Sequence, residues 1–334
     1  MPAQVTLRLN MTGLAADPRD EARRYLAAIE MAEWAEDLGL GVVNLEEHHC
    51  AENGWLSSPL VLAAMIVART KRIRVSVSAL LAPLYEPIRL AEDIAVLDLV
   101  SGGRFSFVAG LGYRPLEYHA MGKSWTDRGK LMDEMVETLL AAWKGEPFDF
   151  RGERIRVTPV PQSRPHPFFM LGGGSRPAAR RAARFGLPFC PAVHDPELEA
   201  YYHDQLAHHA QTGLYHSLGD STSMLFVDED PERAWRELAP CFMRELHEYA
   251  SWKVEGVPRP KEEPVESIED LRRQKRFEIL HPDEARARLA GQKSVMVILH
   301  PLAGGLPLDR AWQSLELFAE KVWSPLQQAA ATRA

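Results

Sequence analysis

The sequence lacks any apolar run approaching the roughly 18 residues that a membrane span needs. It also has little cysteine, because only Cys50, Cys190 and Cys241 occur, far apart and odd in number. These three residues give neither a disulfide framework nor a zinc-binding spacing. The first residues show no basic and apolar secretion signal. We therefore expect a protein of the reducing cytoplasm, with no membrane partner.

An excess of positive charge is also missing, since the formal net charge is −7. A nucleic-acid partner is therefore not expected. Several common motifs are absent as well. No Walker loop, nucleophile elbow or Cys-His-Asn pattern is found, and Gly110-Leu111-Gly112 fails as a dinucleotide fingerprint because Pro115 stands where a third glycine is expected. The motifs that are missing thus leave the reaction class open.

Strand-like and helix-like segments alternate along most of the 334 residues. Eight segments are predicted as strands, each followed by a helix: residues 5–9, 41–45, 73–81, 104–109, 168–171, 187–192, 224–227 and 295–299. Eight such units are typical of a (β/α)8 TIM barrel with insertions, an α/β fold, although a doubly wound sheet remains an alternative. We expect one domain over residues 1–334, with a hairpin insertion at 144–165 and a mobile loop or helical insertion at 240–280.

Two acids and two imidazoles follow the second predicted strand as Glu46-Glu47-His48-His49. The carboxyl ends of parallel strands form the rim at which ligands bind in barrel folds. If these residues continue the strand, two side chains point into the barrel mouth and two point toward the helices. A metal site is one alternative, but adjacent histidines diverge on a strand and no third ligand follows. We expect no metal there.

A second signal is the glycine-rich segment 172–176, Gly-Gly-Gly-Ser-Arg, between a predicted strand and a helix that Pro177 opens. Glycines let an anion approach the backbone closely, and a helix N-terminus supplies amide donors. This pattern favours a phosphate site, the alternative being a plain tight turn with a helix cap.

Several segments in order resemble the bacterial luciferase-like, flavin-dependent monooxygenases. These are residues 45–55 with Ser58-Pro59, 82–93, 97–105, 112–115 with Met121-Gly122, 172–175, and 304–307 with 315–320. The resemblance covers most of the chain except about 195–280. It implies a TIM barrel that binds FMN, or the deazaflavin F420, at its C-terminal mouth.

The resemblance also implies site residues. Glu47 and His48 match the family's acid and histidine beside the flavin ring, and His48 is the better general acid or base because imidazole exchanges protons near neutral pH. Further matches are Ser78 and Ala79, where relatives have a non-prolyl cis peptide under the flavin, Gly112, and the phosphate loop of Gly173, Gly174, Ser175 and Arg176. A substrate pocket of His49, Cys50, Trp55 and Tyr113 is expected as well.

Leu111 departs from the family, because many relatives have an arginine there near the flavin phosphate. Arg176 is one substitute, and the departure leaves the choice between FMN and F420 open. The leading hypothesis is an FMN-dependent, two-component monooxygenase. By resemblance, it takes reduced FMN from a separate flavin reductase, forms a C4a-(hydro)peroxyflavin with O2, and oxidises a small apolar organic substrate.

Two alternatives are an F420-dependent hydride-transferring oxidoreductase and a non-catalytic flavin-binding subunit. The family also implies a homodimer formed through the helices that follow the second and third strands.

Overall fold

The computed structural model describes residues 4–217, 223–252, 265–290 and 296–332. Its main sheet has nine strands in the order β10-β9-β11-β1-β2-β3-β4-β7-β8, and every pair of neighbours is parallel. The strands are β1 (Gln4–Leu9), β2 (Val42–Leu45), β3 (Arg74–Leu80), β4 (Phe105–Ala109), β7 (Phe169–Gly172), β8 (Phe189–Cys190), β9 (Met224–Val227), β10 (Phe277–Leu280) and β11 (Met296–Leu299).

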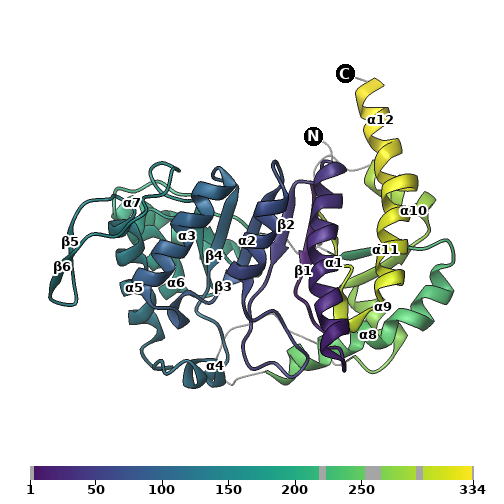
Figure 1. Cartoon of the computed structure of the whole chain (residues 1–334), viewed down its shortest axis with the longest axis horizontal. Helices are drawn as coiled ribbons and strands as arrows, with labels where there is room; N and C mark the ends of the chain where they lie inside the picture. The colour runs from purple at the N-terminus through teal and green to yellow at the C-terminus, as the bar shows by residue number, and fades with distance from the viewer. Residues whose placement is uncertain (1–3, 218–222, 253–264, 291–295, 333–334) are drawn as a thin grey trace.

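Helices cover the outside of this sheet (Figure 1). They are α1 (Pro18–Asp37), α2 (Pro59–Arg69), α3 (Pro87–Ser101), α4 (Pro115–Ala120), α5 (Arg128–Ala142), α6 (Arg176–Phe185), α7 (Pro196–His208), α8 (Pro231–Ser251), α9 (Ile268–Gln274), α10 (Pro282–Ala290), α11 (Leu308–Leu317) and α12 (Ser324–Thr332). Many begin with proline, whose fixed φ suits the first turn and whose missing N–H costs nothing there. Asp17, Asp195 and Asp230 cap α1, α7 and α8 by accepting backbone N–H bonds.

The core lies between the strands and this outer layer of helices. Side chains of β1 such as Leu7 and Leu9 are fully buried, and so are Phe107 of β4 and Phe169 of β7, whose rings stack 5.0 Å apart. Within the described ranges, no helix combines the length and the apolar character that crossing a lipid bilayer requires.

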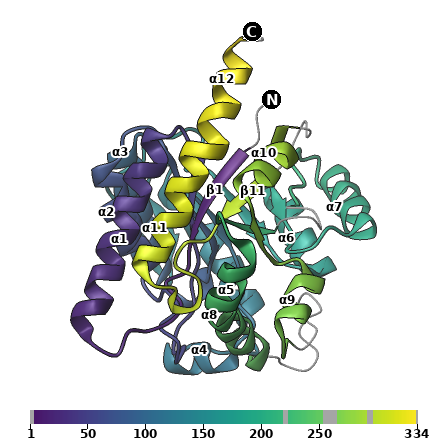
Figure 2. The ribbon, with the colours of Figure 1, turned by 90° about the vertical axis from the view of Figure 1, so that its right-hand side faces the viewer.

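The parallel strands all end on one side of the molecule. In Figure 1 the amino terminus lies at the upper end and α4, which follows β4, lies at the lower end. The same view rotated shows α8 and α4 together at that lower end (Figure 2). The segments that follow β1, β2, β3 and β4 therefore meet there, and this end is the mouth of the barrel.

The parallel sheet with its outer helices confirms the predicted α/β barrel class, and the eight predicted strands are all present, with ends that differ by no more than two residues. Strand β10, at residues 277–280, was not predicted, because it follows a stretch rich in proline and charge. Within 144–165, β5 (Phe148–Phe150) and β6 (Glu153–Ile155) form an antiparallel hairpin that projects from the body (Figure 1). Of the expected insertion at 240–280, residues 253–264 lie outside the described residues, and the remainder contains the end of α8, α9 and β10.

Candidate functional site

A cavity of about 850 Å³ lies at the mouth of the barrel. This volume is near the upper end of the usual range for ligand sites, about 300–1,000 Å³. Its walls come from the ends of β1, β2, β3, β4, β7 and β8, from the first turns of α5 and α6, and from α8. The cavity therefore gathers segments from nearly the whole chain.

The acidic residues after β2 are both held by other parts of the barrel mouth. Glu46 pairs with Arg8 of β1, whose Nε and Nη2 lie 2.5 and 2.9 Å from the carboxylate oxygens. The Glu47 carboxylate accepts hydrogen bonds from the Leu81 N–H at 2.5 Å and from the Tyr85 hydroxyl. Burial and the neighbouring Glu47 charge raise the pKa of Tyr85 well above its usual range, so this hydroxyl stays a donor.

His48 lies in the cavity wall between two oxygen atoms. Its Nδ1 is 2.9 Å from Oε1 of Glu117 in α4, and its Nε2 is 2.8 Å from the Tyr113 hydroxyl. The Glu117 side chain is completely buried. Burial opposes its ionisation, but hydrogen bonds from His48 and from the His49 N–H, together with the charge of Arg114, keep the pKa of Glu117 below its usual value.

Aromatic rings surround His48 on its remaining sides. Trp55 and Trp252 have ring centroids 5.1 and 4.7 Å from that of His48. Tyr249 of α8 lies 5.9 Å from Trp55 and 5.8 Å from Tyr113, measured between ring centroids. Trp55, Tyr113 and Tyr249 line the cavity, which therefore has an aromatic wall beside the imidazole.

The alternation expected if residues 46–49 continued the strand does not apply. The strand β2 ends at Leu45, so these residues lie beyond it. As a result Glu46, Glu47 and His48 all line the cavity. His49 lies outside the lining, and its Nε2 is 3.1 Å from Glu47. Cys50 is exposed, and its carbonyl accepts a bond from Arg114.

The floor of the cavity is formed by the end of β3. The peptide bond between Ser78 and Ala79 is cis, as the family resemblance implies, and both residues line the cavity. A Cβ on Gly110 would lie 2.8 Å from Cβ of Ala79, so only glycine lets β4 approach this bond so closely. Gly112 also lines the cavity, with φ of 72°.

The glycine-rich loop follows β7, which is two strands along the sheet from β3. Gly173, Gly174 and Ser175 line the cavity where α6 begins, and a Cβ on Gly174 would meet nothing within 4 Å. The Ser175 hydroxyl caps no backbone amide. Open backbone N–H groups at a helix N-terminus form a favourable place for an anion.

Sequence reasoning chose Arg176 as the cation of this loop, but Arg176 is exposed and lies outside the lining, with its guanidinium 5.2 Å from the Tyr201 ring. Arg128, at the start of α5, lines the cavity instead. Nothing in the local pattern marks Arg128 except its place in the first turn of a predicted helix.

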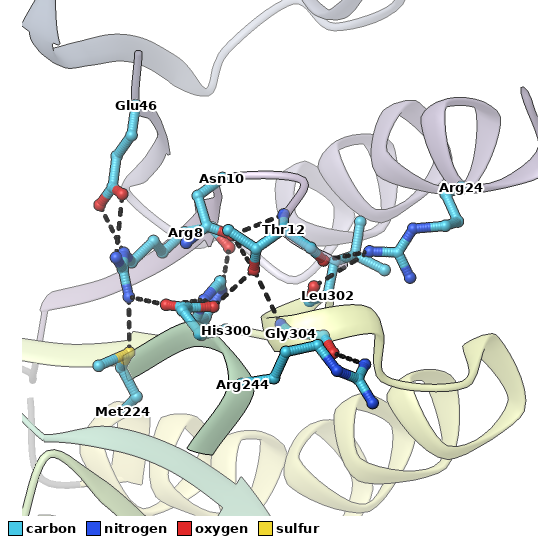
Figure 3. Close-up of polar contacts among 11 residues, drawn as sticks. Arg8, Asn10, Thr12, Arg24, Glu46, Met224, Arg244, His300, Leu302 and Gly304 are labelled. Atoms are coloured by element: carbon cyan, nitrogen blue, oxygen red, sulfur yellow. Dashed lines mark hydrogen bonds and ion pairs between the residues drawn. The ribbon is translucent and has the colours of Figure 1, made fainter. Parts of the chain in front are cut away.

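A buried charge network borders the cavity on the β1 side (Figure 3). Glu245 of α8 lies 3.3 Å from Arg8 Nη1, 3.0 Å from His300 Nε2, and accepts a 2.6 Å bond from the Thr12 hydroxyl. His300 Nδ1 is 3.1 Å from the Arg8 carbonyl. Both ring nitrogens of His300 thus face oxygen atoms, one from the backbone of β1 and one from Glu245. Sequence reasoning missed Glu245 and His300 because they lie far from β2 in the chain.

Two other chemistries find no support at this site. Burial raises the pKa of the Cys190 thiol to about 11, so the one cysteine in the cavity wall stays protonated. Among the residues that the structure describes, no group of three or more His, Cys, Asp or Glu side chains is placed to hold a metal ion.

The fold and the cavity define an α/β barrel in which a glycine-rich helix N-terminus and an acid–imidazole cluster line one cavity. This chain belongs to the luciferase-like monooxygenase family, because the model of that family matches residues 9–296. The resemblance drawn from the sequence is therefore confirmed. A curated relative, 4-hydroxyprotoasukamycin monooxygenase of Streptomyces nodosus subsp. asukaensis, is 28% identical over 263 residues, which are 73% of this chain and 68% of the relative.

Solved structures share the fold over nearly the whole chain. The monooxygenase RslO1 from Streptomyces bottropensis has a TM-score of 0.73 and 23% identity, covering 97% of this chain and 99% of its own. The oxygenating constituent of 3,6-diketocamphane monooxygenase from Pseudomonas putida, in complex with FMN, has a TM-score of 0.68 and 20% identity, covering 97% and 98%. An F420-dependent secondary alcohol dehydrogenase has a TM-score of 0.64 and 15% identity, covering 98% and 99%.

Proposed function

We propose that this protein is a flavin-dependent monooxygenase that uses reduced FMN and O2 to oxidise a small apolar organic substrate. The observation that carries the proposal is a single cavity lined both by the open helix N-terminus at Gly173, Gly174 and Ser175 and by His48. Such a lining suits a cofactor that carries both a phosphate and a ring system. Family membership supports the same class of chemistry.

The described residues fit FMN in two regions. Gly173, Gly174 and Ser175 would hold the phosphate with backbone N–H groups and a hydroxyl, and Arg128 would supply the positive charge. Ser78 and Ala79, which line the cavity, would lie against the ring system. Bound reduced flavin supplies the electrons that activate O2 for insertion of one oxygen atom into the substrate.

The chain's own groups then have separate roles. His48 would handle protons beside the ring. Glu47, whose two oxygens accept bonds from the protein, would keep the ends of β2 and β3 together. Trp55 and Tyr113 would form the apolar wall against the substrate, whereas His49 and Cys50 contribute carbonyls to Arg114 rather than side chains to the cavity.

We also propose a homodimer formed through α2 and α3. These helices pack against each other, and each exposes apolar side chains to solvent: Val61 and Met65 on α2, and Val96 and Val100 on α3. An exposed apolar face of this kind favours a protein partner.

The second partner is a flavin reductase, as expected for an oxygenating component. All three cysteines are free thiols, which agrees with a cytoplasmic location.

An F420-dependent hydride transfer is the second candidate, and Leu111 in the cavity wall favours it, since the cation common in relatives is missing there. Two steps separate the FMN-dependent and F420-dependent candidates. The protein is titrated with FMN, reduced FMN and F420, and any reduced complex is then mixed rapidly with O2. We expect reduced FMN to bind and its complex to react with O2 through a transient absorbance distinct from free flavin. Binding of F420 alone would refute the proposal in favour of the deazaflavin enzyme. Failure to bind either would indicate a non-catalytic subunit.

A further inference from the structure

Both ring nitrogens of His48 are already engaged by the protein. Nδ1 lies 2.9 Å from Glu117 Oε1, and Nε2 lies 2.8 Å from the Tyr113 hydroxyl oxygen. A ligand in the cavity therefore cannot reach a His48 nitrogen unless it displaces one of these groups. Proton exchange between His48 and the ligand needs a different route.

The partner at Nδ1 determines where the proton sits on the ring. Glu117 accepts from the His49 N–H at 3.0 Å and from Arg114 Nη1 at 3.2 Å on the same oxygen that faces His48. The low pKa of Glu117 means that this oxygen belongs to a carboxylate, which can only accept. Nδ1 of His48 must then carry a hydrogen, and the neutral ring has its lone pair at Nε2. The Tyr113 hydroxyl consequently donates to Nε2.

The His48 ring also has no freedom to turn and exchange its two nitrogens. Trp55 packs against it at 5.1 Å and 88°, and Trp252 at 4.7 Å and 58°, while only 7% of the residue is exposed. Arg114 lies over the Trp252 ring at 4.1 Å and binds Glu117 at the same time. One guanidinium thus fixes both the carboxylate and the aromatic ring that confine His48.

We propose that Glu117, His48 and Tyr113 form a proton relay in which Tyr113, at the cavity wall, is the group that meets the ligand. In the forward step a proton leaves the ligand for the Tyr113 oxygen, while the original hydroxyl proton moves to Nε2 of His48. The relay then holds one extra proton as imidazolium beside the Glu117 carboxylate. Reversal of both transfers returns the proton to the ligand. Glu117 is a positioning residue, because it acts on the ligand only through His48. The relay rests on the proposed function, which names the ligand.

The first test needs no cofactor. Nitrogen-15 NMR of the histidine side chains in the flavin-free protein, with His48→Gln to assign the signal, reports which ring nitrogen carries hydrogen. Near pH 8 we expect the proton of His48 on Nδ1 alone. A wild-type ring protonated at Nε2, alone or together with Nδ1, overturns the relay whether or not FMN binds.

Variants separate positioning from simple structural support. Tyr113→Phe should keep the Nδ1–H form of His48, because Glu117 still fixes it. Glu117→Gln should shift the proton partly or wholly to Nε2, because an amide can turn its NH2 toward Nδ1. Glu52→Gln, an exposed residue two positions beyond Cys50, is the control and should change nothing. An unchanged tautomer in folded Glu117→Gln overturns the role of Glu117, and if that variant does not fold, the wild-type and Tyr113→Phe spectra decide.

A second readout uses reduced FMN and O2 as probes. The rate at which O2 oxidises the bound reduced FMN is followed against pH. We expect the Tyr113→Phe substitution to slow the proton-dependent phase of this oxidation by about 10²–10⁴-fold, the usual contribution of a positioned acid or base. The affinity of the variant for FMN should stay within about threefold of wild type. Equal oxidation rates for wild type and Tyr113→Phe overturn the relay. A failure of both of these proteins to bind FMN counts against the proposed function alone.

Discussion

Replacing Glu245 with glutamine tests whether the buried charge network of Figure 3 stabilises the barrel mouth. The substitution keeps the size of the side chain but removes its charge, leaving His300 and Arg8 without an ionic partner on α8. The Glu245 side chain is 3% exposed, so water cannot replace the lost interaction. Removing one partner of a buried ion pair costs about 3–5 kcal/mol. Because glutamine can still accept the Thr12 hydrogen bond, we expect a loss of about 3 kcal/mol.

Thermal unfolding measures this loss directly. A change of 1 kcal/mol lowers Tm by about 2–4 °C in chains of 150–250 residues, so a drop of roughly 6–12 °C is expected here. The matched control is Glu237→Gln on the same helix, because Glu237 pairs with Arg310 at 3.0 Å but is 45% exposed. An exposed pair is worth about 1 kcal/mol or less. Equal shifts in the two variants would refute the assigned role of the network.

The pH dependence of Glu245→Gln gives a second check. Burial opposes ionisation, but His300 and Arg8 hold the pKa of Glu245 well below its ordinary value of 4.5. A carboxylate with a lowered pKa in the folded state contributes its full stabilisation above its unfolded value and loses it as the pH falls. The Tm gap between wild type and variant should therefore be constant above pH 4.5 and narrow below it. A gap that widens in acid would contradict this.

Other predictions follow from single contacts. Arg128→Ala should weaken FMN binding about tenfold or more in a fluorescence titration, as loss of a charge-assisted hydrogen bond does, and leave riboflavin binding unchanged. Gly174→Ala should keep Tm but lower FMN affinity, whereas Gly173→Ala should lower Tm, because its Cβ would lie 2.7 Å from a neighbouring side chain at φ of 142°. Val61→Glu with Met65→Glu should convert a dimer to a monomer in analytical ultracentrifugation; an unchanged mass would contradict the α2–α3 interface.

The sequence predicted the sheet well because a buried parallel strand is a continuous apolar run, visible without knowledge of its neighbours. It did not predict β10, Phe277–Leu280, because the strand includes a glutamate and follows a stretch rich in proline and charge. Its two buried side chains, Phe277 and Ile279, gain their apolar environment from β9 and α8. Such an environment is a property of the fold and not of the local pattern.

The site was predicted in part for a related reason. His48 and the loop at Gly173 carry local signals, namely a polar cluster after a strand and a run of glycines before a helix. Arg128, Glu117 and Glu245 carry none, because each is an ordinary charged residue on a helix. Glu245 meets Arg8 across 237 residues of sequence, and the two come together because β9, which precedes α8, lies one strand away from β1 in the sheet. Arg176 had the stronger local signal, yet its side chain lies outside the cavity.

The cluster after β2 is best understood as three networks rather than one site. Glu46 connects β2 to β1 and, through Arg8, to Glu245 on α8. Glu47 connects β2 to the end of β3 through Leu81 and Tyr85. His48 connects it to α4 through Glu117.

Three consecutive residues therefore tie β2 in three directions around the barrel mouth, and each needs its own partner. Of the three, only His48 has a partner, Tyr113, that is itself uncharged, lines the cavity and can both give and receive a proton. That difference assigns the proton chemistry to His48 and the fixed geometry of the mouth to the two acids.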